Sequence, residues 1–316
     1  MRIVVLDDET AGQDVDWSRL YSLGEVISYP STADENILER ARQAEAILTN
    51  KVPLTRETLS KLPDLRYIGV TATGYDKIDL VTAGEKGITV TNAPGYGTEA
   101  VAQHVFAMLL ALTNRVETHN QDIQNGGWQR EANWTYWLTP LIELGGMKLG
   151  IMGMGSIGQA VARIGKAFGM EILAYSRTPK VIEGVTWCDS AKELFAQSDV
   201  ISLHCPLNEQ THYLVDAELL PHLQPHAFLI NTSRGGLIDE GALHNALAEK
   251  RLSGAALDVL SAEPPPSNHP LIGLDNCFIT PHLAWASRAS RQRLVDMVTE
   301  NLAAFQAGNP QNTVSG

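Results

Sequence analysis

Residues that can move protons or bind anions follow the short apolar runs in the second half of this chain of 316 residues. In an open parallel sheet, ligands bind outside the carboxyl ends of the strands, so residues at these positions are the first candidates for chemistry. Histidine transfers protons near neutral pH, arginine binds carboxylates and phosphates, and a carboxylate favours a charged imidazole beside it. The candidates of these three types are His282, Arg234 and Glu263, which we expect on one edge of a sheet.

A glycine motif precedes these residues. Gly153, Gly155 and Gly158 form a GxGxxG pattern between a short apolar run and a helix-patterned segment. In this context the first glycine permits a tight turn, the second lets the backbone approach a pyrophosphate, and the third lets the helix pack on the strand. The amides at the helix start, at Ser156 and Ile157, can then bind the phosphates. The motif predicts a dinucleotide site, and an ordinary strand-to-helix turn is the alternative.

The elements that must position these residues alternate between strand and helix patterns along the whole chain. The expected strands are Arg2–Leu6, Glu25–Tyr29, Ala46–Thr49, Tyr67–Val70, Ile88–Thr91, Lys148–Met152, Glu171–Tyr175, Val200–Cys205, Phe228–Asn231, Ala255–Val259 and Phe278–Thr280. Between them lie helical patterns, including a long apolar helix over Thr98–Thr113 that could run between two domains. This alternation of strands and helices predicts an α/β protein with two Rossmann-like, doubly wound parallel-sheet domains and a cleft between them.

We expect a split first domain, residues 1–97 plus 286–316, because an amphipathic helical pattern at Ser287–Ala307 can return to it. Residues 98–285, which contain the glycine motif, would form the dinucleotide-binding domain.

The composition and net charge of the chain indicate which partners and which cellular compartment to expect. The net charge of −12 argues against nucleic acid or an anionic membrane as a partner. The chain has no run of membrane-spanning length and no secretory signal pattern, so a cytoplasmic protein is expected. Its 3 widely spaced cysteines indicate neither a disulfide framework nor a metal site.

Ordered motifs are spread over nearly the whole chain. They are Thr73–Asp79, Asn92–Gly95, His204–Leu207, Asn231–Asp239, Ala256–Val259 with Glu263 and Pro264, and Thr280–His282. Together they resemble the D-isomer-specific 2-hydroxyacid dehydrogenase family. Asn50–Val52 and Pro140–Leu144 are most similar to its glycerate dehydrogenase and hydroxypyruvate (glyoxylate) reductase branch.

The resemblance implies a mechanism that the residue types support. Reduction of a 2-oxo acid requires a proton donor for the carbonyl oxygen as hydride reaches carbon 2, and His282 takes this role. Glu263 would orient the imidazole, and Arg234 would hold the substrate carboxylate and polarise the carbonyl. The alternatives are a structural histidine, a solvated loop acid and a surface arginine. Seven further histidines have no matching context and are interpreted as structural: His104, His119, His212, His222, His226, His244 and His269.

The resemblance also assigns the remaining contacts. The substrate carboxylate would meet Lys51 and the glycine loop Ala72, Thr73 and Gly74 of a flavodoxin-like first domain, where a plain turn and a surface lysine are the alternatives. Asp258 would accept a hydrogen bond from the nicotinamide carboxamide, or else be a satisfied strand-end acid. The full set of expected cofactor contacts is Thr98, Gly153, Gly155, Ser156, Ile157, Gly158, Ser176, Arg177, Thr178, His204, Pro206, Thr211, Thr232, Ser233, Asp258 and Ala284.

The end of the second strand of the dinucleotide domain predicts which cofactor is preferred. An NAD-selective site has Asp or Glu there, about twenty residues past the glycines, to bind the ribose hydroxyls. This chain has Ser176, Arg177 and Thr178, with Lys180 close by, which favours a 2′-phosphate. We therefore expect NADP(H) to be preferred over NAD(H). The alternative is that Arg177 stacks on adenine and both cofactors bind.

An aromatic cluster lies between the long helix and the glycine motif. Trp128, Trp134, Tyr136 and Trp137 predict either a homodimer interface, as in relatives, or burial within the subunit.

The sequence thus predicts a reductase of small 2-oxo acids, most simply hydroxypyruvate and glyoxylate. Another D-2-hydroxyacid substrate and a cofactor-sensing corepressor-like protein are the alternatives.

Overall fold

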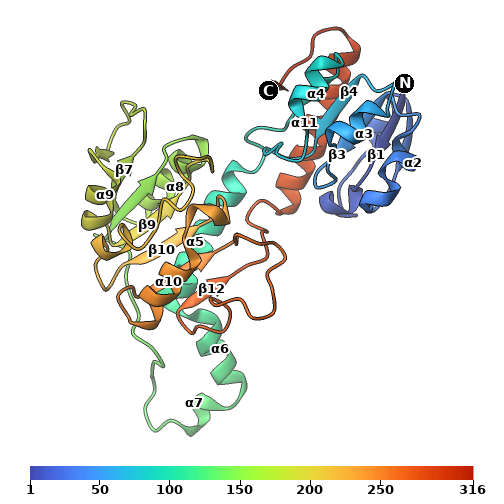
Figure 1. The fold of residues 1–316 in the computed structure, drawn as a ribbon. Coiled ribbons are helices and arrows are strands. Elements are labelled where there is room, and N and C mark those ends of the chain that lie inside the picture. Colours follow the sequence, from blue (N-terminus) through green and yellow to red (C-terminus); the bar gives the residue numbers. More distant parts are fainter. Residues whose placement is uncertain (316) are drawn as a thin grey trace. The chain divides into compact units, whose positions relative to one another are not determined.

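The computed structural model describes residues 1–315, which form two compact units, residues 1–97 with 285–315 and Thr98–Ala284 (Figure 1). Each unit is an α/β layer built around its own sheet. The α/β fold class with two doubly wound sheets is therefore confirmed. The functional roles assigned to the two units stay predictions at this point.

The first unit has a six-stranded sheet in the order β13-β5-β4-β3-β1-β2. Its strands are β1 (Arg2–Val5), β2 (Glu25–Ser28), β3 (Ala46–Thr49), β4 (Tyr67–Val70), β5 (Thr89–Thr91) and β13 (Thr313–Val314). All neighbours pair in parallel except β13, which pairs antiparallel with β5. The sequence analysis did not predict β13, because two residues are too few to show a pattern.

Side chains cap three of the helices in the first unit. The helical segments are η1 (Asp8–Ala11), α1 (Ser18–Tyr21), η2 (Asp34–Asn36), α2 (Ile37–Ala41), α3 (Arg56–Ser60), α4 (Leu80–Glu85) and α11 (Arg288–Gln306). Thr55, Asp79 and Ser287 accept hydrogen bonds from amides in the first turns of α3, α4 and α11. Such caps satisfy amides that have no partner within the helix.

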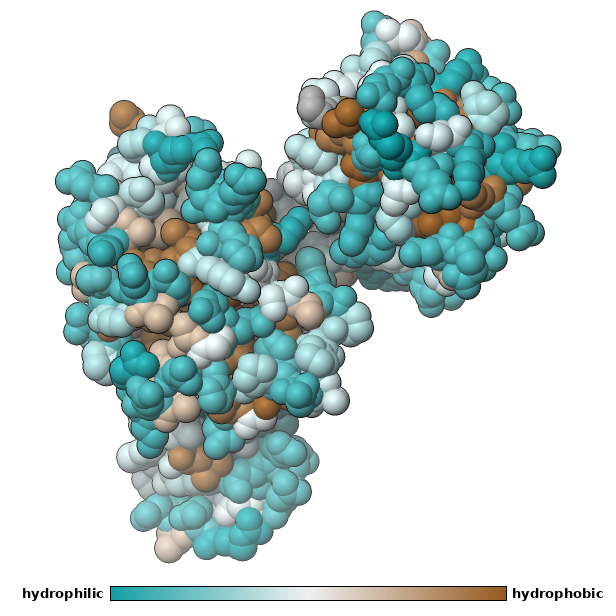
Figure 2. Space-filling view, viewed as in Figure 1, coloured by the Kyte–Doolittle hydropathy of each residue, from teal (hydrophilic) through white to brown (hydrophobic). Residues whose placement is uncertain are grey.

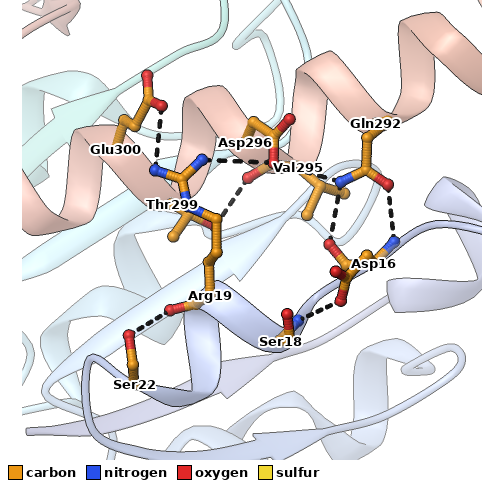
Figure 3. A network of polar contacts seen from close by, with 9 residues as sticks. All are labelled: Asp16, Ser18, Arg19, Ser22, Gln292, Val295, Asp296, Thr299 and Glu300. Carbon is orange, nitrogen blue, oxygen red and sulfur yellow. Dashed lines mark hydrogen bonds and ion pairs between the residues drawn. The ribbon is translucent and has the colours of Figure 1, made fainter.

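Helix α11 returns to the start of the chain through a polar network (Figure 3). Gln292 accepts from the Asp16 amide at 2.7 Å and donates to the Asp16 carbonyl at 3.0 Å. Arg19 of α1 pairs with Glu300 at 3.2 Å and with Asp296 at 3.6 Å. Beside this network, Leu294, Val298 and Leu302 are buried with Ile3 and Leu48 in one core cluster.

The second unit has a seven-stranded sheet in the order β12-β11-β10-β9-β6-β7-β8. The strands are β6 (Lys148–Met152), β7 (Glu171–Tyr175), β8 (Thr186–Trp187), β9 (Val200–Leu203), β10 (Phe228–Asn231), β11 (Gly254–Leu257) and β12 (Cys277–Ile279). Every neighbouring pair is parallel, so all the strands end at one edge. The chain proceeds from β6 to β7 and β8 in one direction and resumes at β9 in the other, which makes β6 the switch point where ligands bind in such sheets.

Helices cover both faces of this sheet. The helices of the second unit are α5 (Thr98–Asn114), α6 (Val116–Gln124), α7 (Gly127–Arg130), α8 (Ser156–Ala167), α9 (Ala191–Gln197) and α10 (Glu240–Ala248), with the short turns η3 (Leu220–His222) and η4 (Gly235–Leu237), and α6 and α7 extend away from the sheet (Figure 1). The long helix α5, predicted from its apolar run, packs against α8, β10 and β11 within the second unit. Its buried residues join those of β6 and α8 in one core. No helix in residues 1–315 is long and apolar enough to cross a membrane.

Candidate active site

The glycine turn connects β6 to α8 at the switch point. Gly153 has φ of +98°, which favours glycine, and a Cβ there would lie 2.7 Å from the His204 carbonyl carbon. A Cβ at Gly158 would overlap the Gly153 carbonyl oxygen, so this glycine lets the helix approach the turn. A Cβ at Gly155 would instead meet open space. The turn is therefore closed on the protein side and open on the side where a pyrophosphate would bind.

The start of α8 supplies amides for that pyrophosphate. Gly155 precedes the helix, no side chain caps it, and its first turn has no acidic residue. Within residues 1–315, the amides of Ser156, Ile157 and Gly158 have no hydrogen-bond acceptor. The open Gly155 face and these amides fit a dinucleotide phosphate, which the dipole of this 12-residue helix would also favour.

The end of β7 presents positive charge at the same sheet edge. Ser176 is half-buried, and Arg177, Thr178 and Lys180 are exposed. Over the described residues Arg177 forms no salt bridge and Lys180 forms none either. Ser176 thus takes the place of the acidic residue that would select NAD, and two cations without salt bridges follow it closely.

His204 follows β9 and is held as a neutral imidazole. Burial lowers its pKa to about 3. Its Nε2 lies 2.8 Å from Ser202 Oγ, while the buried Nδ1 has no partner in the described chain. Thr232 Oγ1, after β10, is likewise buried without a partner. Buried polar atoms without partners are unusual in folded proteins, so a ligand that bonds to them fits this edge.

Two predicted cofactor contacts already use their hydroxyl groups. Thr211 Oγ1 donates to the Pro206 carbonyl at 2.7 Å and closes the loop after His204. Ser233 Oγ donates to the Leu203 carbonyl at 2.7 Å. Their roles in cofactor binding, like that of half-buried Thr98, stay predictions.

Arg234 lies on a turn that Asn231 organises. The buried Asn231 accepts from the Ser233 amide at 3.0 Å and donates to the Arg234 carbonyl at 2.8 Å. The exposed guanidinium donates to the Ser233 carbonyl at 2.8 Å. Sequence reasoning did not assign this role to Asn231, because an asparagine after a strand is typical of many turns.

Asp258 anchors the segment that carries His282. Its buried carboxylate accepts from Thr280 Oγ1 at 2.6 Å, from the Leu283 amide at 2.9 Å and from the Ala284 amide at 2.9 Å. Its carbonyl accepts from the His282 amide at 2.8 Å. The structure thus shows the satisfied strand-end acid that was the alternative for this residue. Its bond to a carboxamide, and the cofactor contact of Ala284, stay predictions.

His104 on α5 joins the same cluster, although its sequence context carried no signal. Its Nε2 lies 3.1 Å from Thr280 Oγ1 and 3.6 Å from an Asp258 carboxylate oxygen. The interpretation of His104 as structural holds in the sense that it supports the 280–284 segment.

The histidine and the acid meet directly. His282 Nδ1 lies 2.7 Å from Glu263 Oε2, and the two side chains are 28% and 36% exposed. His282 has φ of +52°, a left-handed conformation that costs a non-glycine residue free energy, and the Asp258 contacts hold it there. Because a carboxylate accepts, Nδ1 carries a proton and Nε2 is the nitrogen that exchanges one. The arrangement is that of a general acid and base with its orienting carboxylate.

The Arg234 turn packs against the Glu263 loop. A Cβ at Gly235 would overlap the backbone of Leu260, and the Leu260 amide donates to Glu263 Oε1 at 3.0 Å. β10, β11 and β12 are neighbours, so Arg234, Glu263 and His282 follow adjacent strands at one edge. The second unit therefore gathers the three residues that the sequence singled out.

The predicted substrate loop belongs to the first unit. Ala72, Thr73 and Gly74 follow β4, and in the part of the chain described none of their amides has an acceptor. Thr73 Oγ1 donates to the Ala93 carbonyl at 2.9 Å, which fixes the loop. The exposed Lys51 donates its amide to buried Asp7 at 2.6 Å. The amides could hold a carboxylate, and substrate binding by these residues stays a prediction.

The geometry and the comparisons define the class of protein. Residues 106–284 match the family model described as "D-isomer specific 2-hydroxyacid dehydrogenase, NAD binding domain". The chain belongs to this family, as the motifs predicted, and is an NAD(P)-dependent 2-hydroxyacid dehydrogenase that acts on small 2-oxo and 2-hydroxy acids.

Individual relatives align along nearly all of the chain. A hydroxypyruvate reductase of Blautia hydrogenotrophica is 43% identical over 321 residues, covering 100% of both chains. The solved structure of an acyclic imino acid reductase in complex with NADPH and D-Arg has a TM-score of 0.89 at 31% identity, covering 99% of this chain and 100% of that one. An NADPH-dependent glyoxylate/hydroxypyruvate reductase of Sinorhizobium meliloti, in complex with NADP and malonate, has a TM-score of 0.85 at 30% identity, covering 99% and 96%. All three are named as reductases, and the corepressor-like alternative gains no support from them.

We predict that His204 makes stability depend on pH below neutrality. Its pKa of about 3 in the folded protein lies below the ordinary value of 6.5. Between these values the unfolded chain binds a proton that the folded chain does not, so stability is full above pH 6.5 and falls as pH falls. The slope from this residue is at most about 1.4 kcal/mol per pH unit. Urea unfolding at pH 7 and pH 5 should show a smaller pH difference for His204→Gln than for the wild type. An equal difference in both proteins would contradict the assignment.

Proposed function

We propose that this protein reduces hydroxypyruvate and glyoxylate with NADPH, yielding D-glycerate and glycolate. The observation that carries the proposal is the hydrogen bond of 2.7 Å between His282 and Glu263, at the sheet edge that also presents Arg234. The substrates are supported by the names of the relatives, a hydroxypyruvate reductase and a glyoxylate/hydroxypyruvate reductase. D-stereochemistry is carried over from the family. Another small 2-oxo acid remains the alternative substrate.

In the proposed mechanism, the residues of this chain bind and protonate the acid. A reduced nicotinamide cofactor, when bound, would supply hydride to carbon 2 of the substrate. Arg234 binds the substrate carboxylate and its neighbouring carbonyl oxygen, which orients carbon 2. His282 Nε2 gives its proton to that oxygen as charge develops on it, and Glu263 stabilises the imidazolium before transfer. In oxidation, neutral His282 accepts the hydroxyl proton. The amides of Ala72, Thr73 and Gly74, with Lys51, would complete the carboxylate site.

The first experiment compares turnover of hydroxypyruvate, glyoxylate and pyruvate with NADPH, in the wild type and in His282→Ala. We expect the variant to lose about 10²- to 10⁴-fold in kcat, because general acid catalysis contributes about that much. His226→Ala is the matched control, since exposed His226 pairs with Asp199 at 2.7 Å in the same unit. Near-normal turnover by His282→Ala would disprove the assignment of the acid and base.

The proposed preference for NADPH depends on Ser176, Arg177 and Lys180. It is supported by the two solved reductases, one bound to NADPH and one to NADP. We expect kcat/KM for NADPH to exceed that for NADH at least tenfold in the wild type. Arg177→Ala should reduce the NADPH value about tenfold, the loss of one hydrogen bond to a charged group, and leave NADH almost unaffected. Equal losses for both cofactors would indicate stacking on adenine instead. Lys192→Ala, at an exposed residue of α9, serves as the control.

The aromatic segment after α5 supports a homodimer. Trp128, Trp134 and Trp137 are 50%, 86% and 67% exposed, so the alternative of burial in their own subunit was wrong. Figure 1 shows α6 and α7 extending from the second unit, and Figure 2 shows a small group of hydrophobic residues at the upper end of that part of the surface, which is otherwise mostly hydrophilic. Exposed apolar segments of this kind are typical of interfaces.

We expect Trp134→Glu combined with Trp137→Glu to shift the protein from dimer to monomer in analytical ultracentrifugation. The charges would be buried without partners in the interface. Tyr21→Glu, at an aromatic position of the first unit that is 57% exposed, should leave the mass unchanged. A dimer that persists in the double variant would exclude this segment as the interface.

A further inference from the structure

We propose that Glu240, Ser261 and His269 form a positioning cluster that holds the Glu263 loop in register with His282. None of the three was singled out by a motif, and none belongs to the site described above. The inference rests on the proposed function, because it assumes that the Glu263 and His282 pair transfers the proton.

Glu240 is the centre of this cluster. Its Oε1 accepts from the Ser261 amide at 2.7 Å, and its Oε2 accepts from Ser261 Oγ at 2.6 Å. The same Oε2 lies 3.1 Å from His269 Nε2. The side chains of His269 and Glu240 are only 4% and 14% exposed. One carboxylate thus connects two points of the loop, residues 261 and 269, to the first turn of α10.

Glu240 lies at the N-terminus of α10. It is the first residue of the helix, directly after the cap Asp239, whose side chain accepts from the amides of Gly241 and Ala242. A negative charge is stabilised at a helix N-terminus. His269 Nδ1 lies 3.4 Å from the Leu271 amide, which leaves Nε2 as the nitrogen that donates to Glu240.

The contact with Ser261 holds the backbone next to Glu263. Ser261 is two residues before Glu263, and the preceding amide, that of Leu260, donates to Glu263 Oε1. On the other side, the Leu260 backbone packs against Gly235 with no room for a side chain. The loop segment is therefore fixed by Glu240, by the Arg234 turn and by Glu263 itself. Without Glu240, the segment could shift, and Glu263 would no longer align with His282 Nδ1.

Such a shift has a signature that simple destabilisation does not produce. Reduction requires protonated His282, so the rate falls at high pH. If the Glu263 carboxylate no longer lies beside the His282 imidazole, it stabilises the imidazolium less. The alkaline limb of the pH–rate profile then moves to lower pH. We expect Glu240→Gln to move this limb in the acid direction and to lower kcat about tenfold, as small misplacements of catalytic groups do. KM for NADPH should stay within about twofold, because the glycine turn is untouched.

The experiment measures kcat, both KM values and pH–rate profiles for hydroxypyruvate reduction, with thermal unfolding of each variant. Ser261→Ala removes one hydroxyl and should give a smaller shift in the same direction. His269→Gln, whose amide can still donate to Glu240, should retain more activity than His269→Leu. The matched controls are Glu249→Gln, at an exposed pair with Arg251 just after α10, and His226→Gln at its exposed pair with Asp199. Both should keep the wild-type profile.

A folded Glu240→Gln protein with the wild-type profile would overturn the inference, as would a lower kcat with an unmoved alkaline limb. If Glu240→Gln fails to fold, Ser261→Ala decides by the same criteria. Glu263→Gln separates this inference from the proposed function. If Glu263→Gln moves the limb and Glu240→Gln does not, only the positioning cluster is wrong. If Glu263→Gln itself leaves the profile unmoved, the proposed pair is wrong.

Discussion

The buried carboxylate of Asp258 is the constraint on which the site depends. It accepts hydrogen bonds from one side chain and two backbone amides of the segment 280–284, and its own carbonyl accepts from the His282 amide. Hydrogen bonds to a charged group contribute about 1.5–3 kcal/mol each, and a buried carboxylate without partners would be costly. These bonds offset the unfavourable left-handed backbone of His282 and direct its ring toward Glu263. A residue at a strand end therefore positions the proposed proton donor without having to contact the substrate.

The parallel sheet explains how residues far apart in sequence meet. Because every neighbouring pair in the second unit is parallel, the segments after β6, β7, β9, β10, β11 and β12 all begin at one edge. Glycines then allow these segments to touch through their backbones. Gly153 approaches His204, Gly158 approaches Gly153, and Gly235 approaches Leu260. Backbone contact leaves little freedom, since any added side chain would displace a neighbouring loop, and this rigidity is what general acid catalysis requires.

Some parts of the fold could be predicted from local patterns, and others could not. β6, β7, β10 and α5 were predicted at or within one residue of their bounds, because each is a continuous apolar run or an amphipathic helix. The short strands β8 and β13 were missed, since two residues carry no period and their pairing depends on a neighbour already in place. Helices α6 and α7 were missed as well. Their residues are largely exposed and lack an apolar stripe, and the four residues of α7 are too few to show a pattern.

The sequence by itself determined the family, the α/β class and the glycine turn, and it singled out Arg234, Glu263 and His282 as the candidates for chemistry. These features can be recognised from the spacing of residues along the chain and from residue types that have few other roles. Only the tertiary structure decided how the three are held: the Asp258 bonds, the His104 contact, the Asn231 turn and the link from Glu240 to Ser261 and His269. The physical reason is that each of these contacts joins side chains or amides from different loops. The energy of these contacts depends on distances that exist only after the strands have aligned. The sequence alone does not show which partner a single asparagine, glutamate or histidine will contact.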